Sequence, residues 1–314
     1  MSQTRRSWLI TGGAGFIGSH LVKELVRIGQ RVCVLDNFSS STADNLSSVS
    51  RDIRLLEGDI RSLPVLLDAT RDVDFVLHHA ALVSVPKSLQ NPQETAEINI
   101  QGTQNVLEAA RRNGVKKVLF ASSCAVYGNG LEIPYKETAA MDCLSPYALS
   151  KQAAEELCQF YTRVYGLETA ILRYFNVFGP GQDPNSAYAA VIAKFMQLAR
   201  QGKPLTIDGD GKQERDFVHV ADIVRANLLA ADRAVPGEIY NVGRGESVSL
   251  LELADLLERV CGRPLQRLFR PKREADVRIS RANIAKISAL GFHPSVSLEK
   301  GLTNIWSDGA YSVF

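Results

Sequence analysis

Short apolar runs alternate with amphipathic segments through the first half of the chain. The apolar runs predict buried strands at 7–11, 31–35, 53–57, 74–79, 116–122 and 169–173. Segments of helical length lie between several of these runs and end at glycines such as Gly29, Gly114 and Gly166. This alternation predicts an α/β fold with a parallel sheet wound on both faces, in which ligands bind at the carboxyl ends of the strands.

The pattern changes after Gly179-Pro180-Gly181. Further elements are predicted there: helices at 187–201, 250–262 and 283–290, a short strand at 205–208 and a polar turn at 210–215. A strand and helix within 216–231 and a strand at 238–242 are predicted to return to the sheet. We therefore expect a Rossmann-type domain and a smaller interleaved α/β lobe, composed respectively of residues 1–178 with 216–244 and of residues 179–215 with 245–314.

Composition adds no special partner to this picture. The 314 residues are 45% hydrophobic and 22% charged with a net charge of +2, which favours an ordinary globular protein over one drawn to nucleic acid or to a membrane surface. Residues 1–7 lack a long apolar stretch, so a secretory signal is not expected. The five cysteines are odd in number and scattered, which predicts reduced thiols and a cytoplasmic protein.

The first strand leads into a glycine-rich turn and a helix, the order that dinucleotide binding requires. Gly12, Gly15 and Gly18 leave room for the backbone to approach a pyrophosphate at the helix N-terminus. Asp36 ends the next strand, where a carboxylate can bind both ribose hydroxyls and would repel a 2′-phosphate. No arginine or lysine follows before Arg51, so the predicted cofactor is NAD rather than NADP.

Other residues at or near strand ends complete the predicted cofactor site. Asp59 is expected to face the adenine amino group, and small residues after 74–79 would let the chain pass close to the dinucleotide. The full set of further candidates is Phe16, Ile17, Asn37, Asp59, Ile60, Ala80, Ala81, Asn99, Ser122, Tyr174 and Phe175. His78 and His79 have no companion at metal-ligand spacing and are interpreted as structural.

The helix predicted at 146–165 carries a candidate proton-transfer pair. Ser145 and Pro146 are typical of a helix start, and Tyr147 and Lys151 are four residues apart, so they share one helix face. On their own, a tyrosine and a lysine four residues apart more often lie on a solvent-exposed edge of a helix. An ionised tyrosine near pH 7 requires about 4 kcal/mol, and one cation at about 5 Å supplies roughly 3 kcal/mol, so a second cation is needed.

Taken together, these residues resemble the extended short-chain dehydrogenase/reductase superfamily, and within it the NAD-dependent UDP-sugar 4-epimerases. The resemblance covers almost the whole chain. It rests on the glycine turn, Asp59, Ser123, Tyr147 with Lys151, and the blocks 173–176, 215–220 and 272–276. The segment 79–86 is most similar to the branch that acts on UDP-N-acetylhexosamines. Two residues depart from the family pattern, Ala275 for glycine and Ala193 for proline, and affect only local loop geometry.

The resemblance implies roles for individual residues. Tyr147 would be the base, with Lys151 and the oxidised nicotinamide lowering its pKa, Ser123 would carry the proton, and Asn99 would support the lysine through backbone and water. The implied substrate contacts are Ser84, Ser123, Asn176, Ala190, Val191, Thr206, Arg215, Arg273, Asp276 and Ser280. Asn176, Arg215, Arg273 and Asp276 would hold UDP, whereas the small Ser280 would leave space for an N-acetyl group.

The expected reaction is the interconversion of UDP-GlcNAc and UDP-GalNAc through a 4-keto sugar, with UDP-Glc and UDP-Gal as a second pair. A UDP-hexuronate 4-epimerase remains an alternative, because one extra cation would accept a carboxylate. A 4,6-dehydratase is less favoured, since Cys124-Ala125 offers no acid, and a non-catalytic NAD-binding regulator is the remaining class. By resemblance, the helices at 99–113 and 146–165 are expected to form a homodimer contact, and neither a nucleic-acid nor a membrane partner is expected.

Overall fold

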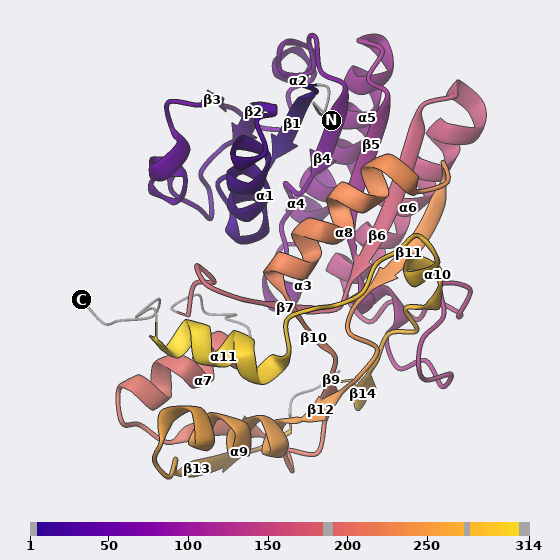
Figure 1. Ribbon diagram of the computed structural model, residues 1–314. Coiled ribbons are helices and arrows are strands. Elements are labelled where there is room, and N and C mark those ends of the chain that lie inside the picture. Colours follow the sequence, from indigo (N-terminus) through magenta and orange to yellow (C-terminus); the bar gives the residue numbers. More distant parts are fainter. Residues whose placement is uncertain (1–4, 185–190, 273–276, 308–314) are drawn as a thin grey trace. The chain divides into compact units, whose positions relative to one another are not determined.

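The chain folds into two compact units, which are described separately. The computed structural model describes residues 5–184, 191–272 and 277–307. Unit 1 contains Met1–Val126, Cys143–Arg173 and Val224–Tyr240, and unit 2 contains Tyr127–Asp142, Tyr174–Ile223 and Asn241–Phe314 (Figure 1). The domain division expected from the sequence stays a prediction.

A seven-stranded sheet forms the centre of unit 1. Its order is β11-β6-β5-β4-β1-β2-β3, and the pairs β1–β2, β1–β4, β2–β3 and β4–β5 are parallel. The strands are β1 (Ser7–Thr11), β2 (Arg31–Asp36), β3 (Ile53–Glu57), β4 (Phe75–His78), β5 (Lys117–Ser123), β6 (Glu168–Tyr174) and β11 (Glu238–Val242). The order reverses at β1, so the carboxyl ends of β1 and β4 flank the position where such folds bind ligands.

Helices cover both faces of this sheet (Figure 1). They are α1 (Phe16–Arg27), η1 (Ala43–Val49), α2 (Leu63–Ala69), α3 (Val85–Gln90), α4 (Pro92–Ala96), η2 (Glu97–Gln101), α5 (Gly102–Arg112), η3 (Cys124–Tyr127), α6 (Pro146–Tyr165) and α8 (Val220–Arg233). Apolar residues of α2, α5 and α6 pack with one face of the strands in a single core cluster, for example Leu66, Val106 and Cys158 against Val76 and Val118. Burial on both faces explains why the central strands β1 and β4 are buried at every position rather than at alternate ones, whereas the edge strand β3 is largely exposed.

Unit 2 is built around a second apolar core. Its elements are β7 (Asn176–Phe178), α7 (Val191–Arg200), β8 (Leu205–Asp208), β9 (Glu214–Arg215), β10 (Phe217–His219), β12 (Val248–Ser249), α9 (Leu250–Cys261), β13 (Arg267–Arg270), β14 (Ile279–Ser280), α10 (Ala285–Ala289) and α11 (Leu298–Ser307). The core joins α7, β8, α9 and α11, with Phe195, Leu253 and Ile305 fully buried. Three small sheets, β10-β7, β12-β9-β14 and β13-β8, lie within its described residues.

The structure confirms the predicted fold class and corrects several elements. The strand in 216–231 does not return to the large sheet, because β10 pairs in parallel with β7, whereas β11 does join it. The expected polar turn at 210–215 ends in the short strand β9. The expected helix at 99–113 is not one regular helix, because it begins within the π-helical turn η2, which follows α4 and precedes α5. Helices α2, α3 and α11 and strand β13 were not predicted.

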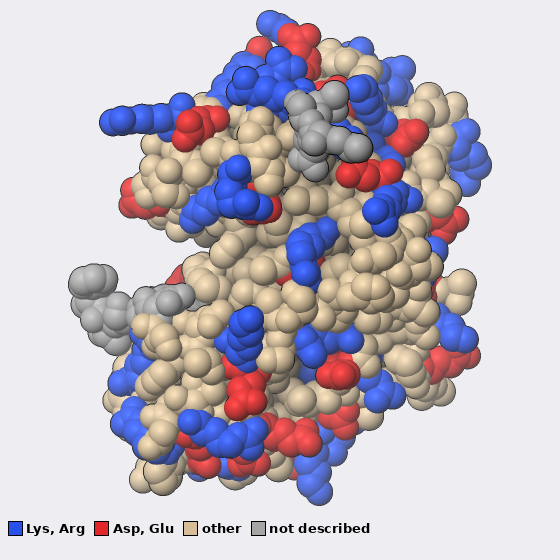
Figure 2. All heavy atoms as spheres, viewed as in Figure 1, with Lys and Arg blue, Asp and Glu red and all other residues tan. Residues whose placement is uncertain are grey.

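The surface charge of the structure agrees with the small net charge of the sequence. On the face shown in Figure 2, basic and acidic side chains are interspersed rather than gathered by sign. Within the described part of the chain, none of the helices has the length and apolar content to cross a membrane.

The turn between β1 and α1 depends on glycine for two different reasons. Gly12 has a positive φ of 68°, and a Cβ there would lie 2.7 Å from the backbone nitrogen of Ala80. A Cβ on Gly18 would lie only 2.1 Å from the carbonyl oxygen of Gly12, so α1 packs directly on the turn. At Gly15, by contrast, a Cβ would meet nothing nearer than that same oxygen at 3.2 Å.

This difference predicts that alanine at Gly18 mainly lowers stability, whereas alanine at Gly15 mainly weakens cofactor binding. Gly18→Ala should lower the free energy of unfolding by about 3 kcal/mol, although alanine is otherwise the better helix residue, because its Cβ overpacks the turn. Gly15→Ala should change the free energy of unfolding by less than about 1 kcal/mol and weaken NAD binding, because its Cβ enters the space left for the pyrophosphate. Urea unfolding and calorimetric titration with NAD measure both effects, and equal losses of stability would contradict the assignment.

Candidate active site

The N-terminus of α1 offers a site that fits the pyrophosphate of a dinucleotide. Gly15 is the N-cap residue, makes no side-chain capping bond, and no acidic residue stands in the first turn of the helix. The free amides and the helix dipole at this end therefore favour an anion. Phe16 and Ile17, both predicted cofactor contacts, are the first two residues of α1 and remain partly exposed.

Asp36 ends β2 beside this helix terminus. Its carboxylate accepts hydrogen bonds from the backbone nitrogens of Ala14 and Phe38, both at 2.9 Å, and from Ser41 Oγ at 3.1 Å. A carboxylate has acceptor sites for about four hydrogen bonds, so a ribose hydroxyl could still bind. The glycine turn and Asp36 thus lie together in unit 1 in an arrangement that fits NAD, and the contact of Asp36 with the ribose stays a prediction.

The remaining adenine-side candidates follow β3. Asp59 accepts hydrogen bonds from Asn37 Nδ2 at 3.0 Å and from the backbone and guanidinium of Arg61. The bond from Arg61 is the main cause that lowers the pKa of Asp59 to about 2. Ile60 is buried with its side chain against Gly102. The structure therefore brings Asn37, Asp59 and Ile60 together at the carboxyl end of the sheet, and their contacts with adenine stay a prediction.

Small residues follow β4, as the sequence predicted. The backbone nitrogen of Ala80 donates to Thr11 Oγ1 at 3.3 Å and lies against Gly12, so Ala80 and Ala81 pass directly beside the glycine turn. His78 is enclosed by hydroxyl groups, with Nδ1 2.7 Å from Thr11 Oγ1 and Nε2 3.0 Å from Thr103 Oγ1. Burial lowers the pKa of His78 well below its usual value and that of His79 to about 3, so both rings are neutral.

Three hydroxyl groups hold the first turn of α6, which carries Tyr147. Ser145 Oγ accepts a hydrogen bond from Ala148 N at 3.1 Å, as expected of the N-cap residue. Ser88 Oγ, on α3, accepts one from Tyr147 N at 3.1 Å, and Ser150 Oγ donates to Tyr147 O at 2.8 Å. The backbone of Tyr147 is therefore fixed on both sides.

The phenol of Tyr147 is buried, and the hydroxyl of Ser123 is near enough to lower its pKa, so the structure brings together this predicted pair. Burial raises the pKa of Tyr147 to about 12, and the effect of Ser123 opposes this only in part. Ionisation near pH 7 then requires about 7 kcal/mol rather than the 4 kcal/mol expected for a tyrosine in water. The burial of Tyr147 was not predicted from the sequence, and it makes ionisation of the phenol depend more strongly on neighbouring positive charge.

Lys151 is buried one turn further along the same helix face. Its Nζ donates to the carbonyl oxygen of Ala121 at 2.8 Å and lies 4.8 Å from the ring centroid of Phe120 and 5.9 Å from that of Tyr147. Burial lowers the pKa of Lys151 to about 8, while the negative charge of Glu155 raises it. The ammonium therefore loses its proton more easily than that of an exposed lysine, and it lies close to the phenol. A positive charge at about 5 Å offsets roughly 3 kcal/mol of the free energy needed to ionise Tyr147.

Asn99 lies in the π-helical turn η2, where a local insertion often marks a functional position. Its Oδ1 accepts from Leu82 N at 2.8 Å, and its Nδ2 donates to Leu82 O at 3.0 Å and to Ser150 Oγ at 2.9 Å. These bonds link the segment after β4 to the first turn of α6. The water-mediated support of Lys151 expected for Asn99 stays a prediction.

A buried carboxylate, that of Glu155, lies beside Lys151 and was not predicted from the sequence. Glu155 Oε1 accepts a hydrogen bond from Ser122 Oγ at 2.5 Å, so the hydroxyl of this predicted cofactor contact is already engaged. Arg173 binds Glu155 through Nε at 2.8 Å and a terminal nitrogen at 2.6 Å. One sequence signal was available, because Glu155 follows Lys151 by four residues, as Lys151 follows Tyr147.

Three of the predicted substrate contacts meet in unit 2. Arg215 and Ser280 are register partners on β9 and β14, and Asn176 Nδ2 donates to the carbonyl oxygen of Asp216, the residue after Arg215, at 3.2 Å. Val191 begins α7, and Thr206 lies in β8, paired with β13 rather than with β9. Tyr174 and Phe175 belong to unit 2, and Ser84 caps α3 in unit 1. Ala190, Arg273 and Asp276 lie outside the described residues.

The lowered pKa of Lys151 predicts how stability changes with pH. Since the folded lysine loses its proton near pH 8 and the unfolded one near 10.5, the unfolded state binds more protons between these values. The free energy of unfolding should therefore rise by about 3 kcal/mol across this window. Lys151→Met should lack this rise, whereas the titration of Tyr147 affects both proteins alike. Urea unfolding of the cofactor-free proteins at several pH values measures the difference, and parallel curves would exclude a buried ammonium.

Comparison with known proteins agrees with this geometry. Residues 8–243 match the NAD dependent epimerase/dehydratase family. A putative UDP-glucose 4-epimerase of Methanocaldococcus jannaschii is 39% identical over 301 residues, which cover 95% of this chain and 96% of the relative. A UDP-glucuronate 4-epimerase of Thermodesulfobacterium geofontis is 34% identical, with 96% of this chain and 95% of the relative covered.

A solved structure shows the same likeness in three dimensions. The UDP-N-acetylglucosamine 4-epimerase from Methanobrevibacter ruminantium M1, in complex with UDP-N-acetylmuramic acid, has a TM-score of 0.94 at 35% identity. The match covers 98% of this chain and 99% of that one. The fold class and the NAD cofactor predicted from the sequence are thus confirmed, and the chain belongs to the NAD dependent epimerase/dehydratase family.

Proposed function

We propose that the protein is a UDP-sugar 4-epimerase that interconverts UDP-GlcNAc and UDP-GalNAc. The observation that carries this proposal is the contact of Tyr147 with Ser123 at the end of β5, with the ammonium of Lys151 beside the phenol ring. A buried phenol next to a buried ammonium and a hydroxyl is suited to taking a proton from an alcohol and returning it. Membership of the NAD dependent epimerase/dehydratase family supports this chemistry.

Each residue of the site has a separate role in the proposed reaction. Bound NAD supplies reversible acceptance of the hydride from carbon 4 of the sugar. Tyr147 takes the proton of the 4-hydroxyl group, and Ser123 shares that proton through its hydroxyl beside the phenol. Lys151 stabilises the phenolate by charge, and its own proton is held by the carbonyl of Ala121. The second positive charge that the buried phenol requires is the oxidised nicotinamide.

Two observations support an N-acetylated substrate. The solved structure with a TM-score of 0.94 is a UDP-N-acetylglucosamine 4-epimerase. Ser280, the small residue assigned to the sugar 2-substituent, lies on β14 directly opposite Arg215, which is assigned to the diphosphate. An arginine binds a diphosphate by charge-assisted paired hydrogen bonds, so the sugar would follow close to Ser280. UDP-Glc and UDP-Gal, which lack the N-acetyl group, would also fit such a site.

A UDP-hexuronate 4-epimerase is the second candidate. The UDP-glucuronate 4-epimerase of Thermodesulfobacterium geofontis is 34% identical over nearly the whole chain. A dehydratase is less favoured because Cys124-Ala125 offers no carboxylate for the elimination of water. The two candidates share the proton-transfer residues and differ only in the substituents of the sugar. The distinction therefore depends on the substrate and not on the chemistry of Tyr147.

An assay of several sugar nucleotides tests the proposal directly. The protein is incubated with NAD and separately with UDP-GlcNAc, UDP-GalNAc, UDP-Glc and the UDP-hexuronates, and the sugars are followed by proton NMR. We expect inversion at carbon 4 of UDP-GlcNAc and UDP-GalNAc without net formation of NADH. Inversion of the uronates alone would favour the second candidate, a 4-keto-6-deoxy product a dehydratase, and no reaction at all a regulator.

Removal of a single hydroxyl tests the role of Tyr147. Tyr147→Phe should lower kcat by at least about a hundredfold, because the base of the reaction is lost. Its thermal stability should change little, since the ring is kept. Tyr165→Phe is a matched control, because Tyr165 is half exposed at the end of the same helix, and it should keep full activity. A Tyr147→Phe variant that turns over at the normal rate would refute the assignment.

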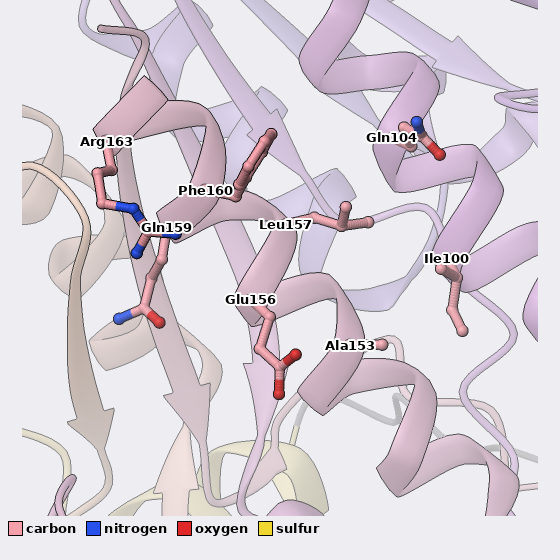
Figure 3. A pocket seen from close by; sticks show the side chains of 8 residues that line it. All are labelled: Ile100, Gln104, Ala153, Glu156, Leu157, Gln159, Phe160 and Arg163. Carbon is pink, nitrogen blue, oxygen red and sulfur yellow. The ribbon is translucent and has the colours of Figure 1, made fainter. Parts of the chain in front are cut away.

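We also propose that the protein forms a homodimer through α6 and the adjoining helix. Figure 3 shows a groove between α6 and the η2–α5 segment, lined by Ile100, Gln104, Ala153, Glu156, Leu157, Gln159, Phe160 and Arg163. Phe160, Leu149 and Val164 expose between 39% and 57% of their surface along α6. Apolar side chains that are contiguous and exposed are typical of an interface, and two antiparallel copies of this helix pair would cover them.

Charge placed in this groove tests the dimer. Phe160→Asp should convert the dimer to a monomer, because burying a carboxylate in the contact would be strongly unfavourable. Leu131→Asp is the matched control, since Leu131 is 97% exposed in unit 2 and should leave the dimer intact. Light scattering coupled to gel filtration measures the mass. A wild-type monomer, or a Phe160→Asp dimer, would contradict the proposal.

A further inference from the structure

Ser122 stands between Ala121 and Ser123, two residues of β5 that act directly on the proton-transfer pair. On one side, the carbonyl of Ala121 accepts the hydrogen bond from Lys151 Nζ at 2.8 Å, and on the other the hydroxyl of Ser123 acts on the phenol of Tyr147. Side chains alternate along a strand, so the hydroxyl of Ser122 points away from that of Ser123. It donates instead to Glu155 Oε1 at 2.5 Å, and only 3% of Ser122 is exposed.

Glu155 is held rigidly in turn. Arg173 on β6, the strand next to β5, grips its carboxylate with two hydrogen bonds of 2.8 and 2.6 Å. The side chains of Arg173 and Glu155 are 1% and 2% exposed. A buried pair of this kind persists only when its geometry and hydrogen bonds are well satisfied, and it then adopts one arrangement. Ser122 therefore has a fixed partner rather than a mobile one.

We propose that Ser122, Glu155 and Arg173 form a positioning unit that sets the end of β5 for proton transfer. The unit holds the backbone so that the carbonyl of Ala121 meets Lys151 and the hydroxyl of Ser123 meets Tyr147. None of its three residues needs to contact the substrate. This inference rests on the epimerase function proposed above and extends it from the reacting groups to the residues that orient them.

The charge of Glu155 gives the unit a second effect. Lys151 is faced by Tyr147, Glu155 and Cys158 from α6, by His78 from β4 and by His79 directly after that strand, and Arg173 acts on it through Glu155. Both histidines are neutral, and burial keeps the thiol of Cys158 protonated by raising its pKa. Glu155 thus provides the negative charge that favours the ammonium, while its bond to Ser122 provides the geometry.

Two variants separate the geometric effect from the charge effect. Ser122→Ala removes only the hydrogen bond, so kcat should fall about tenfold through misplaced groups while KM changes less than about twofold. The alkaline limb of its kcat–pH profile should stay in place, because no charge is lost. Glu155→Gln keeps the volume but leaves Arg173 without its counter-ion, so the alkaline limb should move to lower pH as Lys151 loses its proton more easily.

A matched control distinguishes positioning from general stability. Thr70 is fully buried between α2 and α5 and donates a hydrogen bond to Leu66 O at 2.7 Å, away from the site. Thr70→Val should lower thermal stability as Ser122→Ala does and leave kcat and its pH profile unchanged. The double variant of Ser122→Ala and Glu155→Gln should combine the lower kcat with the shifted alkaline limb, because the carbonyl oxygen of glutamine still accepts from the Ser122 hydroxyl and each change therefore removes a different effect.

One further measurement does not depend on turnover. In the NAD-loaded protein, the ionisation of Tyr147 is followed by tyrosinate absorbance, with the Tyr147→Phe form of each protein subtracted. Ser122→Ala should move this ionisation to higher pH, because Ser123 no longer stabilises the phenolate. A wild type without epimerase activity would refute the proposed function, whereas an unchanged tyrosinate titration or an unchanged kcat in Ser122→Ala would refute the positioning unit alone.

Discussion

Burial of charge and potential charge at the end of β5 is the constraint on which the candidate site depends. Tyr147 and Lys151 are both removed from water, and burial acts on them in opposite directions, raising the pKa of the phenol and lowering that of the ammonium. Each shift opposes the ionised pair that proton transfer requires. The pair is therefore poised between two states, and small additional charges decide which state is populated. A coenzyme that changes its charge during the reaction is well suited to control such a pair.

The surrounding structure is arranged to make this burial possible. Hydroxyl groups of Ser88, Ser145 and Ser150 fix the first turn of α6, and Asn99 in its π-helical turn ties that turn to the segment after β4. On the other side, the Arg173–Glu155 pair fixes Ser122. Ser145 is partly exposed and the other groups are buried, and since each makes a hydrogen bond, none can rearrange without losing one. The rigidity of the site follows from this network and from the packing of α6 on the sheet.

The division of the chain into two units also bears on function. Unit 1 contains the glycine turn, Asp36 and the proton-transfer residues, whereas Asn176, Arg215 and Ser280 meet on the small strands of unit 2. Most groups assigned to the coenzyme and the chemistry thus belong to unit 1, although the cofactor candidates Tyr174 and Phe175 belong to unit 2 and the substrate candidate Ser84 to unit 1. Relatives that match nearly the whole chain are named for both neutral and acidic sugars.

The sequence by itself determined where the strands of unit 1 lie along the chain, the glycine turn with helix α1, and the helix face that Tyr147 and Lys151 share. Each of these is a local pattern, in which neighbouring residues specify a strand, a turn or a helix face. Tertiary structure decided the rest. Strand β10 pairs with β7 instead of the large sheet, the helix around Asn99 contains a π-helical turn, and Ser122 turns toward Glu155. These outcomes depend on partners distant in sequence or on burial, and burial also moves the pKa of Tyr147 to about 12, which no local pattern encodes.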